Sequence, residues 1–176
     1  YNSDNELVIH PLLGASSVKK RHDVHNREVE TIYLDNEYQP VNNCYGIHRN
    51  IILYDTNARP KLSVNLDMYG NYTCPKGQYF AINYIEYNDN NQQISQKLYD
   101  DNGVLLQAMF FIWNQTGDLH YISWVNKEND SYKVGGVFDY VKKEWVSDVT
   151  SCAEQLKSLY GFDVNAEHIF DDKLLE

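Results

Sequence analysis

The sequence has 176 residues, 43% of them hydrophobic and 14% aromatic, with 25 acidic against 15 basic residues and a formal net charge of −10 at pH 7. This length suits one domain with a substantial hydrophobic core, or a closed barrel around a cavity. The negative charge disfavours nucleic acid and anionic membranes as partners, and no apolar run approaches the length of a membrane span.

The first predicted element is an N-terminal arm, residues 1–27, with at most a short helical turn. From Glu28 onward, segments rich in Tyr, Ile, Val and Phe recur, and clusters of Asn, Asp or Gly end each one. They predict eight strands, at residues 28–34, 45–55, 61–70, 78–88, 92–100, 104–114, 119–128 and 133–143. Short turns such as "NDNN" and "QTGD" join them, which favours an up-and-down barrel or a meandering sandwich. We find no internal repeat and predict a single domain, residues 1–176.

One helix is predicted after the strands, at residues 147–160. Its apolar stripe has helical spacing and consists of Val149, Cys152, Ala153, Leu156, Leu159 and Tyr160. Ser147 or Asp148 can cap its start, and Gly161 suits the left-handed residue that follows a helix. Because the helix is amphipathic, we expect it to pack on the outside of the sheet. Residues 163–176 are predicted to form an extended closing segment and tail.

Two features predict secretion. The chain begins at Tyr1 without a leader, as a mature secreted protein does after removal of its signal peptide, although a trimmed chain would begin in the same way. Sequons at Asn71, Asn114 and Asn129 predict glycosylation in an extracellular location.

The three cysteines, Cys44, Cys74 and Cys152, match no zinc-binding spacing and are too few for a disulfide scaffold. In an extracellular chain they predict one disulfide and one free thiol. The alternative is a cytosolic protein with three buried free cysteines.

The order of eight strands, one helix and a final extended segment resembles the lipocalin family. The resemblance is strongest over residues 104–172, where "LKSLYGFDVNAEHIFDD" is similar to the helix and closing strand of insect bilin-binding and apolipoprotein-D-like lipocalins. The Gly-x-Trp motif of the family would fall on Asn26, Arg27 and Glu28, and is absent. The resemblance implies an all-β fold, an eight-stranded up-and-down antiparallel β-barrel over residues 28–143 with the helix outside. It also implies a disulfide from Cys44 to Cys152 or Cys74.

The resemblance further implies which side chains line the barrel. The expected inward, ligand-binding residues are Met109, Phe111, Trp113, His120, Ile122, Trp124, Val137, Asp139 and Val141. The opposite faces, with Leu119, Tyr121, Val125, Phe138 and Tyr140, are expected under the helix. The expected lining is aromatic with a few polar groups, which is typical of small-molecule sites. The alternative is that the same side chains fill the barrel as core.

The predicted function is that of a secreted carrier for one small hydrophobic or amphipathic molecule, such as a bilin pigment, a lipid, a retinoid or an amine. No cofactor is required, although a bilin or lipid can be bound, and the protein is expected to be a monomer or a weak homo-oligomer. The alternative is a secreted protein-interaction module with a filled barrel that acts through its mouth loops.

No catalytic motif supports an enzyme. His22 and His25 have a spacing found in some metal sites, but two histidines alone favour a solvated loop. The chain has no nucleophile elbow, and Gly135-Gly136 lies within a predicted strand, where a bulge is expected rather than a phosphate site.

Overall fold

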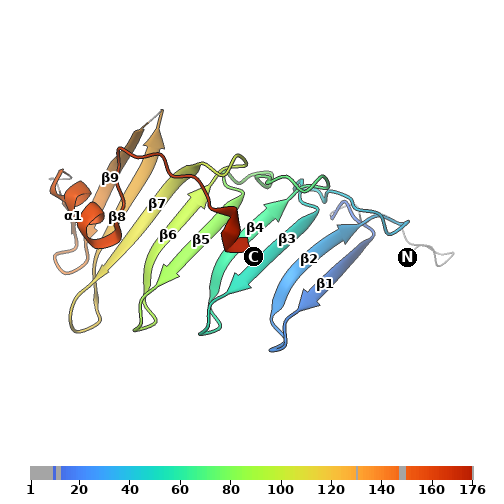
Figure 1. The fold of residues 1–176 in the computed structure, drawn as a ribbon, viewed down its shortest axis with the longest axis horizontal. Coiled ribbons are helices and arrows are strands. Elements are labelled where there is room, and N and C mark those ends of the chain that lie inside the picture. Colours follow the sequence, from blue (N-terminus) through green and yellow to red (C-terminus); the bar gives the residue numbers. More distant parts are fainter. Residues whose placement is uncertain (1–9, 11–12, 130, 147–149, 176) are drawn as a thin grey trace. The chain divides into compact units, whose positions relative to one another are not determined.

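The computed structural model describes residues 10, 13–129, 131–146 and 150–175 (Figure 1). In this part of the chain the strands are β1 (Ser17–His22), β2 (Glu28–Leu34), β3 (Arg49–Tyr54), β4 (Pro60–Leu66), β5 (Ile82–Tyr87), β6 (Gln93–Tyr99), β7 (Leu105–Trp113), β8 (Leu119–Glu128), β9 (Ser131–Asp139) and β10 (Glu144–Trp145). The helices are α1 (Thr150–Tyr160) and a short 3-10 helix, η1 (Asp172–Leu175). The protein is therefore mostly β, with one α-helix near its C-terminus.

The ten strands follow one another in chain order from β1 to β10 in an antiparallel sheet. The sheet is not closed, since the strand order ends at β1 on one side and β10 on the other. The expected barrel of eight strands is thus not what the described residues form. They divide into two compact units, one running to Asn83 and including Asp100–Gly103 and the residues from Asp172, the other containing Tyr84–Tyr99 and Val104–Asp171.

Each of the eight predicted strands is present, and two further strands were not predicted. Strand β1 lies in the expected arm and pairs with β2, from Ser17 opposite Leu34 to His22 opposite Glu28. It was missed because its sequence, "SVKKRH", is charged and mostly exposed, as is common for an edge strand. Strand β10 has only two residues and pairs with the end of β9.

Several of the turns share one geometry, which Asp35 illustrates. Its Oδ1 atom accepts hydrogen bonds from the backbone N–H groups of Glu37 and Gln39, at 2.8 and 2.9 Å. Tyr38, the fourth residue of the turn, has a left-handed backbone with φ 61°. A short acidic or amide side chain is needed at the first position, because it replaces the backbone partners that a sharp turn leaves open.

The same turn recurs, and between residues 23 and 100 it does so at a regular spacing. Oδ1 atoms accept from the backbone N–H groups two and four residues on at Asp23, Asn43, Asp55, Asp67 and Asn114 as well. Asp23, Asp55 and Asn88 begin turns 32 and 33 positions apart, and Asp35, Asp67 and Asp100 do so too. The expectation of no internal repeat was therefore wrong: each repeat is a pair of strands with its two turns.

In the unit that contains α1, Figure 1 shows the helix beside β8 and β9, and residues of β7, β8 and β9 line a pocket with Gln155 and Leu156 of the helix. Phe110 of β7 is 1% exposed, and its ring lies 5.1 and 5.0 Å from the rings of Tyr160 and Phe162. Leu156 faces the sheet and is buried, whereas Leu159 of the predicted stripe is exposed. Gly161 ends the helix with φ 64°, as predicted.

Other predicted features of the helix region fall outside the described residues. Ser147, Asp148 and Val149 are among these, as is the side chain of Cys152. The final segment is extended near Ile169, which bridges to Val104 at the start of β7.

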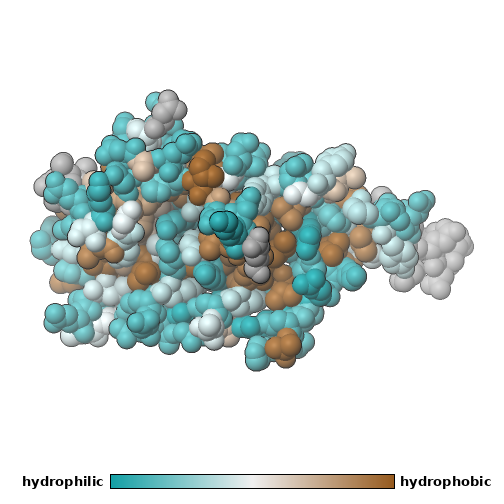
Figure 2. Space-filling view, in the orientation of Figure 1, coloured by the Kyte–Doolittle hydropathy of each residue, from teal (hydrophilic) through white to brown (hydrophobic). Residues whose placement is uncertain are grey.

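One face of the molecule is predominantly polar. Figure 2 shows mostly hydrophilic residues on the viewed face, with hydrophobic ones in small groups between them. In the described part of the chain, no helix has both the length and the apolar composition needed to cross a membrane.

Candidate functional site

Four of the nine predicted ligand-binding residues share one face of the sheet. In the register of β7 and β8, Met109 lies opposite Trp124 and Phe111 lies opposite Ile122. Because successive side chains of a strand point to opposite faces, these four lie on the face away from α1, which packs on Phe110. They were correctly placed on a common face, but that face does not line the inside of a closed barrel.

Val137 and Asp139 lie on the other face, toward α1. Val137 pairs with Ser123, and Asp139 pairs with Tyr121. Phe138, which was expected under the helix, is opposite Ile122 instead. The predicted faces of β9 were therefore exchanged.

A β-bulge explains the exchange. Trp124 pairs with Gly136 but Val125 pairs with Val134, which leaves Gly135 as an extra residue in β9. One extra residue turns every side chain beyond it to the opposite face. A Cβ on Gly135 would lie 2.8 Å from the side-chain nitrogen of Asn126, so a larger residue there would displace that side chain.

The remaining three predicted residues, Trp113, His120 and Val141, lie at the ends of strands or in a turn. The indole N–H of Trp113 donates to the backbone carbonyl of Gln93, at 2.8 Å. The ring of His120 stacks on its neighbour Tyr121, at 3.9 Å between centroids. Val141 is 65% exposed in the turn after β9.

The face away from α1 carries an aromatic cluster formed by Trp124, Phe138, Tyr140 and Trp145. The Trp145 ring lies 5.3 Å from that of Trp124 and 5.4 Å from that of Phe138, and Phe138 lies 4.9 Å from Tyr140. Trp145 is 62% exposed. Gly136 makes room for it, because a Cβ at this position would lie 2.8 Å from the Trp145 ring.

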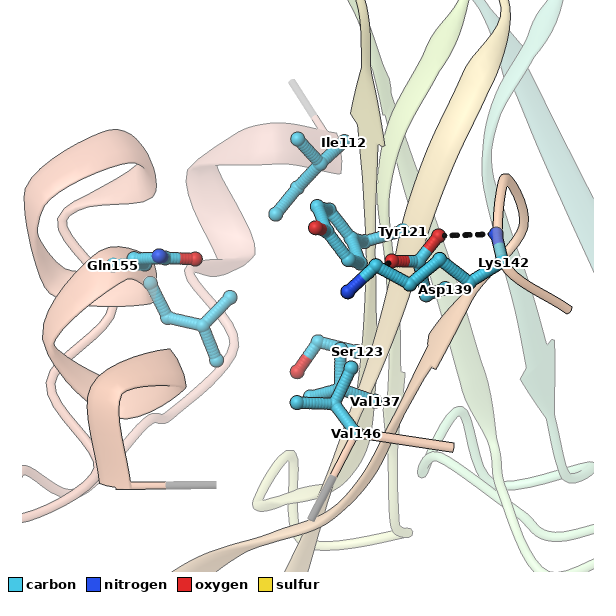
Figure 3. Close-up of a pocket in the computed structure, with 9 residues that line it drawn as sticks. Ile112, Tyr121, Ser123, Val137, Asp139, Lys142, Val146 and Gln155 are labelled. Atoms are coloured by element: carbon cyan, nitrogen blue, oxygen red, sulfur yellow. Dashed lines mark hydrogen bonds and ion pairs between the residues drawn. The ribbon is translucent and has the colours of Figure 1, made fainter. Parts of the chain in front are cut away.

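A pocket of about 200 Å³ lies between α1 and the sheet (Figure 3). Its lining is Ile112, Tyr121, Ser123, Val137, Asp139, Lys142, Val146, Gln155 and Leu156. Figure 3 shows Tyr121, Ser123 and Lys142 extending from the sheet side toward the helix, from which Gln155 points back. The pocket thus has an apolar lining from both sides with several polar groups directed into it, as small-molecule sites commonly do.

The carboxylate of Asp139 is only half satisfied by the described residues. Its Oδ1 atom accepts from the backbone N–H groups of Val141 and Lys142, at 2.9 and 3.0 Å. Its Oδ2 atom is buried and accepts no hydrogen bond from the described residues. The Nζ atom of Lys142 lies 4.0 Å from Oδ2, which is beyond hydrogen-bonding distance.

A second polar group in the pocket has no hydrogen-bond partner in the described part of the chain. Ser123 is 2% exposed, and its buried hydroxyl oxygen makes no hydrogen bond with the described residues. Ser123 and Asp139 are diagonal neighbours on adjacent strands, since Ser123 pairs with Val137 two residues before Asp139. Their side chains therefore point to the same face of the sheet, where both line the pocket.

Asp139 is ionised at neutral pH. Its pKa is lowered, first by the backbone N–H of Lys142 and also by that of Val141, while burial acts in the opposite direction. The nearby His120 and Lys142 side chains also lower this pKa. The pocket therefore presents a buried negative charge.

Sequence reasoning missed Ser123, Lys142 and Gln155 as possible site residues. The available signal was Ser123 itself, a small polar residue between apolar ones in "YISWV" on the face assigned to the helix. Lys142 follows β9, and its position depends on the turn that Asp139 caps.

No disulfide joins the two cysteines whose side chains the structure describes. Cys44 and Cys74 are both free. They lie in different loops, between β2 and β3 and between β4 and β5, and Cys44 is exposed. No group of three or more His, Cys, Asp or Glu side chains suited to a metal ion occurs among the residues that the structure describes.

Comparison of the chain with models of protein families gives no match, and comparison with curated proteins gives none either. The resemblance to lipocalins therefore stays a hypothesis.

Proposed function

We propose that the protein binds a small amphipathic molecule in the pocket between α1 and strands β7–β9. The observation that carries this proposal is the pair of buried polar groups, Asp139 Oδ2 and Ser123 Oγ, which lie in the lining beside apolar side chains from the sheet and the helix. A buried polar group without a hydrogen bond costs about 1–3 kcal/mol. A ligand that supplies hydrogen bonds to both groups would recover this cost on binding.

The size of the pocket limits the ligand. Sites for drug-sized molecules usually measure about 300–1,000 Å³. At about 200 Å³ this pocket suits a shorter molecule than a bilin or a retinoid. Of the predicted ligand classes, small amphipathic molecules such as amines fit best.

Binding would remove apolar surface from water on both sides of the pocket. Ile112, Val137, Val146 and Leu156 supply this surface. Each Å² of apolar area buried contributes about 25 cal/mol, and the polar groups set the orientation of the ligand. The role is therefore that of a carrier or a sequestering protein.

The other parts of the predicted function belong to the same proposal. Secretion would place the protein where it can collect a free ligand, and Asn71 and Asn129 of the sequons are exposed. The alternative, a protein-interaction module acting through its loops, stays a prediction.

The proposal is tested by screening small amphipathic fragments against the protein labelled with ¹⁵N. We expect hits that shift the amide signals of Ser123, Val137 and Leu156 in a saturable way. Gln155→Trp, an exposed position on the rim of the pocket, should block these shifts. Ser158→Trp, on the same helix and also exposed but outside the lining, should leave them unchanged. Fragment binding that survives Gln155→Trp, or no binding at all, would refute the pocket as the site.

A further inference from the structure

We infer that the ligand of this pocket carries a primary ammonium group on a short apolar chain, with Asp139 Oδ2 and Ser123 Oγ accepting hydrogen bonds from it. This inference rests on the proposed function and adds the chemical class of the ligand.

The hydrogen-bonding capacity of the two groups favours a donor. An ionised carboxylate can only accept, and both backbone donors available to Asp139 already bind Oδ1. A serine hydroxyl can also accept. A primary ammonium has three N–H groups, which match three acceptors of the lining: Asp139 Oδ2, Ser123 Oγ and the Tyr121 hydroxyl, which Figure 3 shows extending from the sheet side.

Charge favours a cation over a neutral donor or an anion. A hydrogen bond from a cation to a carboxylate is about twice as strong as a neutral one. An anionic ligand would have to enter beside the buried carboxylate of Asp139, which is 1% exposed. Such a like-charge contact is unfavourable in a desolvated site.

The chain itself places an ammonium group next to this carboxylate. Lys142 Nζ lies 4.0 Å from Oδ2 on a side chain that is 68% exposed. It is close enough for electrostatic attraction but leaves the acceptor position of Oδ2 open. Lys142 is thus a tethered cation that competes with the ligand, and it can move to solvent when the ligand enters.

Binding of 3-methylbutylamine tests the inference. Its neutral isostere 3-methylbutan-1-ol and the anion 3-methylbutanoate serve as controls, with affinities measured by calorimetry and by amide shifts. We expect the amine to bind at least tenfold more tightly than the alcohol, and 3-methylbutanoate not to bind. Leucine separates the two sources of such a group. If leucine binds more tightly than the amine to wild type but not to Lys142→Gln, its carboxylate pairs with Lys142, and an amino acid is favoured as the ligand over a simple amine.

Three variants make the test specific. Asp139→Asn keeps an oxygen for the turn but replaces Oδ2 with an amide, and should remove the preference for the amine over the alcohol. Ser123→Ala should weaken amine binding several-fold without lowering the melting temperature. Lys142→Gln should strengthen amine binding. Asp163→Asn, which also caps a turn and pairs with a lysine, is the matched control and should change nothing.

The outcomes separate this inference from the proposed function. If the amine and the alcohol bind equally, and Asp139→Asn leaves both affinities unchanged, the ammonium inference is wrong and the pocket remains a binding site for another ligand. If neither these probes nor the fragments shift the pocket signals, both proposals fail. Equal melting temperatures of wild type and Asp139→Asn would show that lost binding is not caused by unfolding.

Discussion

Arg27 pairs with Asp23 across a five-residue turn, with the Arg27 Nη2 atom 2.6 Å from Asp23 Oδ2. The same contact recurs one repeat later between Arg59 and Asp55. In both turns the second carboxylate oxygen binds the arginine, while the first accepts backbone N–H groups. Each aspartate therefore acts both as a turn cap and as one half of an ion pair.

This double role predicts acid sensitivity. The pKa of Asp23 is lowered from 3.8 to about 2, first by the backbone N–H of Arg27, and also by the Arg27 side chain and the backbone N–H of His25. Because the unfolded chain then binds the proton more tightly, acid favours unfolding. The stabilisation from Asp23 is complete above about pH 5 and is lost as the pH falls through about 2.

Urea denaturation of wild type and Asp23→Asn at several pH values checks this prediction. Asparagine keeps the capping oxygen, as Asn114 does in its own turn, but cannot titrate. We expect the free energy of unfolding to depend less steeply on pH between about 5 and 2 in the variant. If the free energy of unfolding changes with pH equally steeply in both proteins, Asp23 does not contribute to the pH dependence.

Alanine substitutions at two glycines should distinguish the stability cost of a left-handed backbone from the cost of a steric clash. Gly14 and Gly46 both have left-handed backbones, with φ 71° and 83°. A Cβ on Gly14 would lie 2.8 Å from the backbone nitrogen of Cys44, whereas a Cβ on Gly46 would have nothing within 4 Å. Gly46→Ala should therefore cost only the left-handed conformation, about 1–2 kcal/mol. Gly14→Ala should cost roughly 3–4 kcal/mol, because backbone atoms must also move. Equal losses in chemical denaturation would contradict the close approach.

The free cysteines should differ in reactivity. Cys44 is exposed, whereas Cys74 is half-buried, and its thiol pKa is raised, first by burial and then by the charge of Asp101. Since the thiolate is the reactive form, a thiol reagent at pH 8 should label Cys44 well before Cys74 under native conditions. Peptide mass spectrometry over time measures both rates. Failure of Cys44 to react without a reducing agent would indicate a disulfide.

The strands could be predicted from the sequence because local patterns determine them. Segments dense in β-branched and aromatic residues end at short Asp, Asn or Gly clusters, and both signals are local. The limits of β2 and β8 were predicted without error. Strand β1 could not be predicted from its own sequence. Its charged residues form a strand because they pair with β2, and this pairing leaves no pattern within residues 17–22.

The faces of β9 and the pocket could not be predicted for a different reason. Gly135 adds one residue to β9, and "GG" indicates a bulge without showing which side chains it turns. The expected lining therefore combined residues from two faces. The repeat was also missed, because Tyr38, Ala58, Gly70 and Asn91 occupy the same left-handed position with no common residue type.

Docking of α1 depends on Phe110, and this gives the last prediction. Its ring is buried against the rings of Tyr160 and Phe162, the two residues that flank Gly161 at the end of the helix. Phe110→Ala should lower the free energy of unfolding by about 3–5 kcal/mol, because a large cavity replaces the ring. Leu159→Ala on the same helix should change it by less than about 0.5 kcal/mol, because Leu159 is 60% exposed. Amide hydrogen exchange should show faster exchange along α1 in the first variant and not in the second.

If Phe110→Ala unfolds the whole chain, Phe110→Leu, which retains more of the packing, is used in its place. A helix that stays protected in both variants would show that contacts other than Phe110 hold it on the sheet, and that the pocket beneath it does not depend on this ring.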